Sequence, residues 1–153
     1  MITAQIESFE HAIGELRRIF PEHWRELALF QDKMPLVPQY IEYVRREHAG
    51  QLFLATVRWD GKIVAYYTAQ VMPGFHYGTT YTGTMDMLYV LPEVRGKGVI
   101  IPLMRCVERE LRRRSVQIWY SGYKTGNPLG LDQLLPKFGF IPADSYFAKW
   151  IGA

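Results

Sequence analysis

Residues 85–99 read Met85-Asp-Met-Leu-Tyr-Val-Leu-Pro-Glu-Val-Arg-Gly-Lys-Gly-Val99, so that an apolar strand passes through a proline into a basic turn with two glycines. A long amphipathic pattern follows, which places this turn at the N-terminus of a predicted helix. Glycines let a ligand approach the backbone closely, and the N–H groups at a helix N-terminus attract anions. Residues 95–98 therefore predict a binding site for a phosphorylated ligand.

Two common phosphate-binding motifs do not fit this turn. A P-loop needs Gly-Lys followed by serine or threonine, but Lys97 is followed by Gly98, so no hydroxyl is placed for a magnesium ion. The dinucleotide fingerprint needs a third small residue where Ile101 stands, and Ile101 would block close packing of the helix against the strand. A magnesium nucleotide and a dinucleotide are therefore both disfavoured.

The turn resembles the acyl-CoA pyrophosphate loop of the GNAT superfamily of N-acetyltransferases, whose signature is Arg or Gln, two residues, Gly, one residue, and then Gly or Ala. Residues 95–100 follow this signature except at Ile100, which replaces the final small residue. The resemblance extends to Leu88–Glu93 as the preceding strand and edge, and to Lys137–Phe140 as a late Gly-Phe element. It spans most of the chain.

The resemblance implies a site for acetyl-CoA as the acyl donor. In the family the pantetheine arm bonds to backbone groups of the strand before the loop, which corresponds to Leu88, Tyr89 and Val90. The phosphates would be held by the loop residues Arg95, Gly96, Lys97, Gly98, Val99 and Ile100. Asn127 resembles a family asparagine that contacts the cofactor, although Asn127-Pro128 could equally be a turn that starts a helix.

Two residues are candidates for the general base that accepts the proton of the attacking amine. Asp86 is the polar exception in an apolar run, and strand alternation puts it on the face of Leu88 and Val90, where the thioester is expected. Many relatives carry a glutamate in this position, so the shorter Asp86 would act through a bridging water. His76, in a loop on the expected acceptor side, is the rival base because its reference pKa lies nearer neutrality. Each could instead lack a chemical role, Asp86 as a strand-end hydrogen-bond acceptor and His76 as a solvated loop residue.

The family usually protonates the departing CoA thiolate from a tyrosine in the helix before the Gly-Phe element. Here Leu134 or Leu135 occupies that position, and neither side chain can donate a proton. Tyr123 is the candidate replacement, because it follows the predicted strand 116–120 on the side where the thiol is expected to emerge. Solvent is the alternative acid, since a thiolate with a pKa near that of cysteine is a tolerable leaving group at neutral pH. Tyr123 would then be a loop aromatic without a chemical role.

The sequence predicts an α+β fold of three layers, in which a mixed, mostly antiparallel sheet is flanked by helices on both faces, as in the GNAT layout. Asp60-Gly61 predicts a type I′ hairpin turn between two of the strands. Predicted strands cover residues 3–6, 52–59, 62–71, 81–90, 116–120 and 145–150. Predicted helices cover residues 9–20, a further turn after Pro21, and residues 41–50, 99–111 and 129–137.

Composition and length bound the class of protein. The 153 residues fit a single domain spanning 1–153, and a hydrophobic content of 48% argues against disorder. Cys106 has no partner for an internal disulfide, and no Cys/His cluster has zinc spacing, so no metal is expected. The net charge of +3 is mild, and pairing with Glu108 and Glu110 near a helix C-terminus explains the run Arg112–Arg114. A nucleic-acid partner is therefore not expected.

The sequence also bears on the cell compartment. Met1–Glu7 lacks a basic start followed by an apolar run, and nowhere do about 18 apolar residues follow one another. We therefore expect a cytoplasmic protein with no membrane partner. Phe20–Glu26 and Phe147–Ile151 are similar to segments of GNAT proteins from bacteriophages, for which the compartment would be the host cytoplasm.

These observations lead to one hypothesis and one alternative. The hypothesis is an N-acetyltransferase that moves an acetyl group from acetyl-CoA to an unidentified primary amine by direct attack in a ternary complex. The alternative is a non-catalytic acyl-CoA-binding or protein-interaction module of the same fold, which Ile100 and the missing family tyrosine both allow. Whether the chain forms a homodimer is left open.

Overall fold

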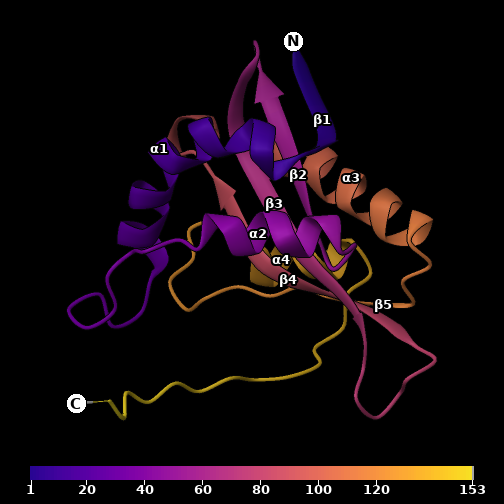
Figure 1. Cartoon of the computed structure of the whole chain (residues 1–153). Coiled ribbons are helices and arrows are strands. Elements are labelled where there is room, and N and C mark those ends of the chain that lie inside the picture. Colours follow the sequence, from indigo (N-terminus) through magenta and orange to yellow (C-terminus); the bar gives the residue numbers. More distant parts are fainter. Residues whose placement is uncertain (153) are drawn as a thin grey trace.

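The fold is a five-stranded sheet with helices on both faces (Figure 1). The computed structural model describes residues 1–152. The strand order is β1-β2-β3-β4-β5, and neighbouring strands are antiparallel except for β4 and β5, which are parallel. The strands are β1 (Ile2–Glu7), β2 (Leu52–Trp59), β3 (Lys62–Pro73), β4 (Tyr81–Val90) and β5 (Ile118–Tyr120).

Four α-helices within residues 1–152 form the outer layers. One face of the sheet is covered by α1 (Phe9–Leu27) and α2 (Tyr40–His48), and the other by α3 (Ile100–Arg113) and α4 (Leu131–Lys137). A 3-10 turn, η1 (Pro92–Val94), follows β4. In that part of the chain, no helix is both long enough and apolar enough to cross a membrane. The arrangement confirms the predicted three-layer, GNAT-like fold.

Local sequence features explain where several elements begin and turn. The Ser8 hydroxyl accepts a hydrogen bond from the N–H of Glu10 at 3.1 Å and so caps α1. Asp60 and Gly61 have φ angles of 48° and 82°, as a type I′ turn requires, which confirms the predicted hairpin. Pro21 lies inside α1, which continues through it to Leu27 as one helix rather than two segments.

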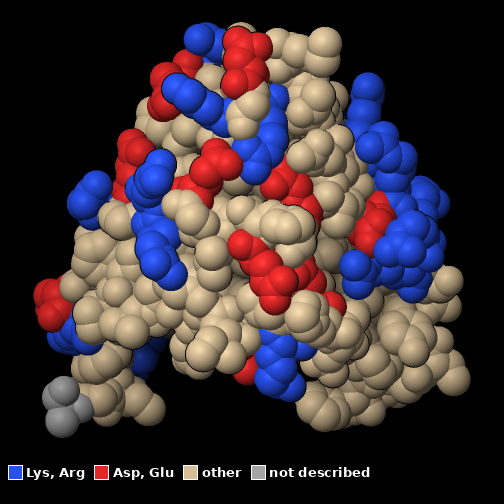
Figure 2. All heavy atoms as spheres, turned by 45° about the horizontal axis from the view of Figure 1, so that its top comes forward, with Lys and Arg blue, Asp and Glu red and all other residues tan. Residues whose placement is uncertain are grey.

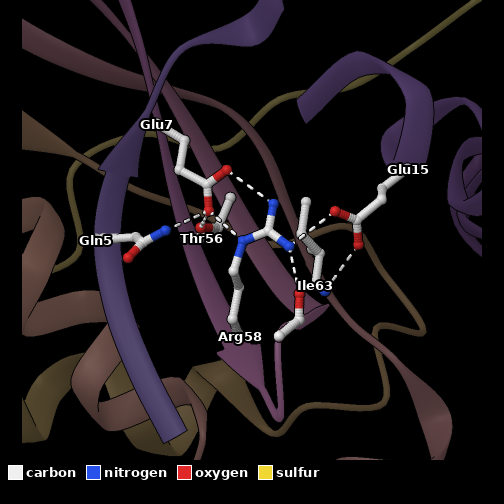
Figure 3. Close-up of polar contacts among 7 residues, drawn as sticks. Gln5, Glu7, Glu15, Thr56, Arg58 and Ile63 are labelled. Atoms are coloured by element: carbon white, nitrogen blue, oxygen red, sulfur yellow. Dashed lines mark hydrogen bonds and ion pairs between the residues drawn. The ribbon is translucent and has the colours of Figure 1, made fainter. Parts of the chain in front are cut away.

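Arg58 ties the first strand and the first helix to the hairpin (Figure 3). Its guanidinium donates to Glu7 of β1 at 2.6 and 2.9 Å and to Glu15 of α1 at 2.7 Å. The second oxygen of Glu15 accepts from the backbone N–H of Ile63 at 3.1 Å. Burial alone would raise the pKa of Glu7, but hydrogen bonds from Arg58 and Thr56 lower it to about 2. One cation therefore holds β1, α1, β2 and the start of β3 together.

Basic side chains gather on the outer side of α3, which lies at the right in Figure 2. Glu108 accepts from Arg112 at 2.7 Å, and Glu110 pairs with Arg113 at 2.6 Å and with Arg114 at 2.7 Å. The two predicted pairs, spaced four residues apart, are thus both present. Among residues 1–152, no group of three or more His, Cys, Asp or Glu side chains is placed to hold a metal ion.

The end of the chain differs from the prediction. Residues 145–150, predicted as a strand, have no regular structure, and the prediction is wrong because the segment has no neighbouring strand. Tyr146 and Phe147 are 92% and 97% exposed, and no backbone-to-backbone hydrogen bond joins residues 141–152 to the rest of the described chain. We call residues 141–152 the C-terminal arm. The predicted strand 116–120 is shorter, and as the edge strand β5 it exposes Ile118 rather than burying it.

Candidate active site

A cleft opens where β4 and β5 separate. The two strands pair only through Thr82–Thr84 of β4 and Ile118–Tyr120 of β5, so the rest of β4 has no neighbour on that side. The cleft has a volume of about 650 Å³, which lies within the range of small-molecule sites. Its walls include Met85–Leu88 of β4 and, from the segment after β5, Gly122, Tyr123, Lys124 and Asn127.

Asp86 is the inserted residue of a β-bulge in β4. It has no partner in β3, because the two residues that flank it in β4 pair with the consecutive residues Thr68 and Ala69. A bulge interrupts strand alternation and re-aims a side chain. Asp86 therefore lies on the α1–α2 face with Thr68, whereas Leu88 and Val90 pack into the core beneath α3. The prediction that Asp86 shares the face of Leu88 and Val90 is wrong, because sequence alternation does not reveal a bulge.

Thr68 holds the carboxylate of Asp86 in place. The Thr68 hydroxyl donates to Oδ2 of Asp86 at 3.0 Å and accepts from the backbone N–H of Met87 at 3.0 Å. Oδ1 of Asp86 accepts no hydrogen bond from residues 1–152 and is free in the cleft. Burial raises the pKa of Asp86, although the hydrogen bond from Thr68 and the charge of Arg46 oppose this rise. A carboxylate with a raised pKa is a better proton acceptor near neutrality.

The turn after β4 presents unpaired backbone N–H groups. Gly96 and Gly98 both have a φ angle of 76°, a left-handed conformation that glycine adopts without strain. No atom lies within 4 Å of where a Cβ would stand at either glycine, so a ligand can come close to the backbone. The N–H groups of Gly96, Gly98, Val99 and Ile100 donate to no acceptor in the described part of the chain. With the positive end of the α3 dipole behind them, these groups are free to donate hydrogen bonds to an anion.

The side chains of Arg95 and Lys97 have other contacts. Arg95 donates to Glu26 of α1 at 2.7 Å and to the backbone oxygen of Val90 at 3.0 Å. Its guanidinium therefore anchors the turn to α1 and to the end of β4. The ammonium of Lys97 lies 5.5 Å from the centre of the Trp59 ring. In this structure both residues contribute their backbone to the turn, while their side chains stabilise its surroundings.

The residues at the end of β4 have buried side chains, so they can contribute mainly backbone groups to the site. Leu88 and Val90 are buried under α3, and Tyr89 is buried on the opposite face. The Tyr89 ring stacks on His23 at a centroid distance of 4.5 Å, and its hydroxyl has no hydrogen-bond partner among the described residues. His23 lines the cleft and lies 2.6 Å from the Tyr66 hydroxyl. Burial, together with the charge of Lys124, lowers the pKa of His23 to about 4.

The structure brings some predicted site residues together and leaves one out. Tyr123 and Asn127 line the same cleft as Asp86. The side-chain oxygen of Asn127 accepts from the N–H of Leu129 at 2.9 Å, so Asn127 does form the turn that leads into α4. His76 lies in the exposed loop between β3 and β4, packs against Tyr77, and does not line the cleft.

Sequence reasoning missed a large part of the cleft wall. The connection 28–38 between α1 and α2 was not among the predicted site segments, yet its apolar side chains line the cleft together with the last turns of α1. Leu29, Met34, Leu36 and Val37 are exposed to solvent. An apolar run in an exposed loop was the available signal, because isolated folded chains rarely leave such a patch uncovered.

Comparison with known proteins identifies the family. A profile of the acetyltransferase (GNAT) family matches residues 13–129, which is more than half of the chain. The chain belongs to this family. No curated protein sequence matches it.

The fold of this GNAT protein is shared by many solved structures of low sequence identity. A ribosomal-protein-alanine N-acetyltransferase from Brucella melitensis biovar Abortus 2308 is 16% identical with a TM-score of 0.74, covering 99% of this chain and 100% of that chain. An aminoglycoside acetyltransferase from an uncultured soil metagenomic sample is 12% identical with a TM-score of 0.78, covering 99% of both chains. A predicted acetyltransferase from Clostridium acetobutylicum, crystallised with acetyl-CoA, is 17% identical with a TM-score of 0.66, covering 97% and 96%. At these identities the likeness establishes the fold.

Proposed function

We propose that the chain transfers an acetyl group from acetyl-CoA to a primary amine by direct attack in a ternary complex. The observation that carries the proposal is the course of β4. From Asp86 in the cleft, the strand runs without a β5 neighbour to the turn whose N–H groups are unpaired. Membership of the GNAT family supports acyl transfer, and a neighbour of the same fold was crystallised with acetyl-CoA.

The donor site would be built mainly from backbone groups. The pyrophosphate would accept hydrogen bonds from the N–H groups of Gly96, Gly98, Val99 and Ile100. The pantetheine arm would lie along the free edge of β4 beside Met85–Leu88, in place of a strand partner. Ile100 does not prevent this arrangement, because its backbone N–H is unpaired and its side chain packs against the core.

In this mechanism Asp86 would accept a proton and Tyr123 would donate one. The amine nitrogen attacks the thioester carbonyl carbon, so that the new C–N bond forms and the C–S bond breaks. Oδ1 of Asp86 accepts the proton lost by the amine, directly or through a water molecule. The thiolate takes a proton from Tyr123 or from solvent. His76 has no role in this mechanism because it lies outside the cleft.

The function is tested by measuring both binding and turnover. Calorimetry with acetyl-CoA reports the donor site, and release of free thiol on addition of a panel of primary amines reports transfer. We expect binding and amine-dependent release, with a mass increase of the amine by one acetyl group. Binding with no amine-dependent release would contradict acetyl transfer and favour the alternative, a non-catalytic acyl-CoA-binding module.

We also propose that the chain forms a homodimer through its C-terminal arm. The arm exposes Tyr146, Phe147 and Ile151, and β5 is an edge strand with no partner on its outer side. An aromatic side chain buries about 150–250 Å². Two arms docked on partner copies would bury four such side chains, about 600–1,000 Å², which is a large part of the 1,200–2,000 Å² typical of stable interfaces.

The dimer is tested by light scattering at micromolar protein concentration. A dimer is expected for the wild type and a monomer for Phe147→Asp. Phe75→Asp changes an equally exposed aromatic residue in the β3–β4 loop and is expected to leave the dimer intact. A monomeric wild type would refute the proposal.

A further inference from the structure

The charges that line the cleft restrict the acceptor, if the proposed function holds. Among residues 1–152, the ionisable Asp, Glu, His and Lys side chains on the cleft wall are Asp86, His23, Lys124 and Lys149. His23 is neutral at pH 7, because burial and the charge of Lys124 lower its pKa to about 4. The cleft therefore offers one carboxylate and two ammonium groups.

Two carboxylates on the flanking helices are already paired. Glu42 of α2, in a hollow that also contains Asp86, accepts from Arg45 at 2.7 Å and from Arg46 at 2.8 Å. Glu26 of α1 accepts from Arg95 at 2.7 Å. Neither group is left to bind a second cationic group of a ligand, so Asp86 can neutralise one ammonium and no more.

The wall that faces Asp86 from α1 and the 28–38 connection is apolar. Val37, which lines both the cleft and the adjoining hollow with Asp86, is 75% exposed. Exposed apolar side chains around a concave site indicate an apolar ligand. The other apolar residues of this wall are Phe20, Trp24, Leu27, Phe30, Met34 and Leu36.

We propose that the acceptor is a primary amine carried on an apolar or aromatic body with no second positive charge. Its body would bury against the wall, and its amino group would lie at Asp86. Withdrawal from water favours the neutral form of an amine, which is the form that attacks the thioester. A polycation would instead have to place a further ammonium against apolar side chains or beside Lys124 and Lys149.

A pair of amines of equal length tests this proposal. Hexylamine and 1,6-diaminohexane differ only at the far end, where the second carries another ammonium group. We expect kcat/KM for hexylamine to exceed that for the diamine by about tenfold or more. From butylamine to hexylamine, each buried methylene is expected to raise kcat/KM about fourfold. Equal or better use of the diamine would overturn the proposal.

A charge placed on the wall is expected to change this preference. Val37→Glu adds a second carboxylate beside Asp86 and should shift the ratio of hexylamine to diamine at least fivefold toward the diamine. Ile41→Glu is the matched control, because Ile41 is 87% exposed on α2 and does not line the cleft. Its ratio is expected to equal that of the wild type. An unchanged ratio in a folded Val37→Glu variant would contradict the proposed position of the acceptor body.

Binding separates this proposal from the proposed function. Calorimetry of hexylamine and of the diamine with protein saturated with CoA measures acceptor preference without turnover. If neither amine is acetylated but hexylamine binds about tenfold tighter than the diamine, acetyl transfer to these amines fails and the acceptor class stands. If both are acetylated equally well and bind equally, transfer stands and the acceptor class is refuted.

Discussion

The two sides of the cleft are built in different ways. On one side, β4, the glycine turn and α3 follow one another in the chain, and sheet pairing and a buried helix face hold them. On the other side, the 28–38 connection and residues 148–150 of the C-terminal arm line the cleft without regular structure. In the proposed function, the rigid side would suit a constant acyl donor, whereas the irregular side could vary with the acceptor.

Asp86 belongs to the rigid side but faces the irregular one. The bulge in β4 turns it toward α2 and the 28–38 connection, where Thr68 holds it. In the proposed mechanism, the sheet would position the general base and the irregular side would position the acceptor. Changes on the rigid side are therefore expected to alter the chemistry or donor binding, and changes on the irregular side to alter the choice of amine.

The largest effect is expected from removal of the base. Asp86→Asn keeps the size of the side chain and its contact with Thr68 but cannot accept a proton. Turnover with hexylamine is expected to fall by a factor of about 10²–10⁴, with unchanged acetyl-CoA affinity in calorimetry. His76→Ala is the control and is expected to keep wild-type turnover, because His76 lies outside the cleft. Full activity in Asp86→Asn with loss in His76→Ala would assign the base to His76.

The pH dependence of the rate is a second test of Asp86 as the base. Burial raises the pKa of Asp86, and the base must be ionised to act. The rate of the wild type is therefore expected to rise with pH through a pKa above the ordinary value of about 3.9 for aspartic acid. In Asp86→Asn this step is expected to disappear. If the same step persists in the variant, another group controls the rate.

A second effect concerns stability rather than chemistry. Arg58→Met leaves the carboxylate of Glu7 without its main partner, and we expect a loss of about 2 kcal/mol at pH 7, after allowance for solvent screening. Urea unfolding measures it. Arg112→Met, which removes an ion pair whose arginine is 77% exposed, is the control and is expected to cost less than about 0.5 kcal/mol.

The stability difference is also expected to depend on pH. The folded pKa of Glu7 is about 2, below its ordinary value of 4.5, so the carboxylate stabilises the fold above about pH 4.5. That contribution is lost as the pH falls from about 4.5 toward 2. The difference between the wild type and Arg58→Met should therefore shrink over this range. A difference that stays constant to pH 2 would show that the pair acts through packing alone.

The rigid side is also the side that the sequence predicted. The Gly-Lys-Gly turn, the helix after it and the hairpin at Asp60 depend on residues close in the chain, so local rules suffice. Asp86 was recognised as a candidate, but its face was wrong because the bulge depends on how β3 and β4 align.

Structure that depends on distant partners was predicted least well. Aromatic residues such as Tyr146, Phe147 and Trp150 favour a β-strand. A strand must also pair with the edge strand of a sheet, and the sequence does not specify that partner. The side chain of Arg95 matched a phosphate-loop signature, yet Glu26 is 69 positions away in the chain and binds it. The apolar wall of the cleft likewise depends on where the 28–38 connection lies in space.

A smaller effect is expected when a methyl group is added to the turn at residues 95–98. Gly98→Ala places a methyl group where the phosphates are expected, and the dissociation constant for acetyl-CoA should rise by about tenfold. Gly50→Ala is a matched control, because Gly50 has a similar φ of 72° and equally open surroundings at the end of α2. Both variants should lose about 1–2 kcal/mol of stability from the left-handed conformation. Equal donor affinity in the two variants would contradict phosphate binding at the turn.

The smallest effect is expected at Tyr123, the proposed proton donor to the departing thiolate. Tyr123 lines the cleft and is 51% exposed, so its hydroxyl can reach both the ligand and solvent. Solvent also protonates a thiolate readily at neutral pH, since its pKa is near that of cysteine. Tyr123→Phe is therefore expected to lower turnover by only about three- to tenfold, without a change in acetyl-CoA affinity.

The leaving group distinguishes a proton donor from a packing residue at Tyr123. An acetyl thioester whose thiol has a lower pKa than CoA releases a thiolate that needs less protonation. With this donor, the turnover of Tyr123→Phe should approach that of the wild type. Tyr120→Phe, a similarly exposed tyrosine in β5 that does not line the cleft, is the control. A defect that is equal for both thiols would mean that the hydroxyl positions the substrate, and wild-type turnover with acetyl-CoA would leave solvent as the acid.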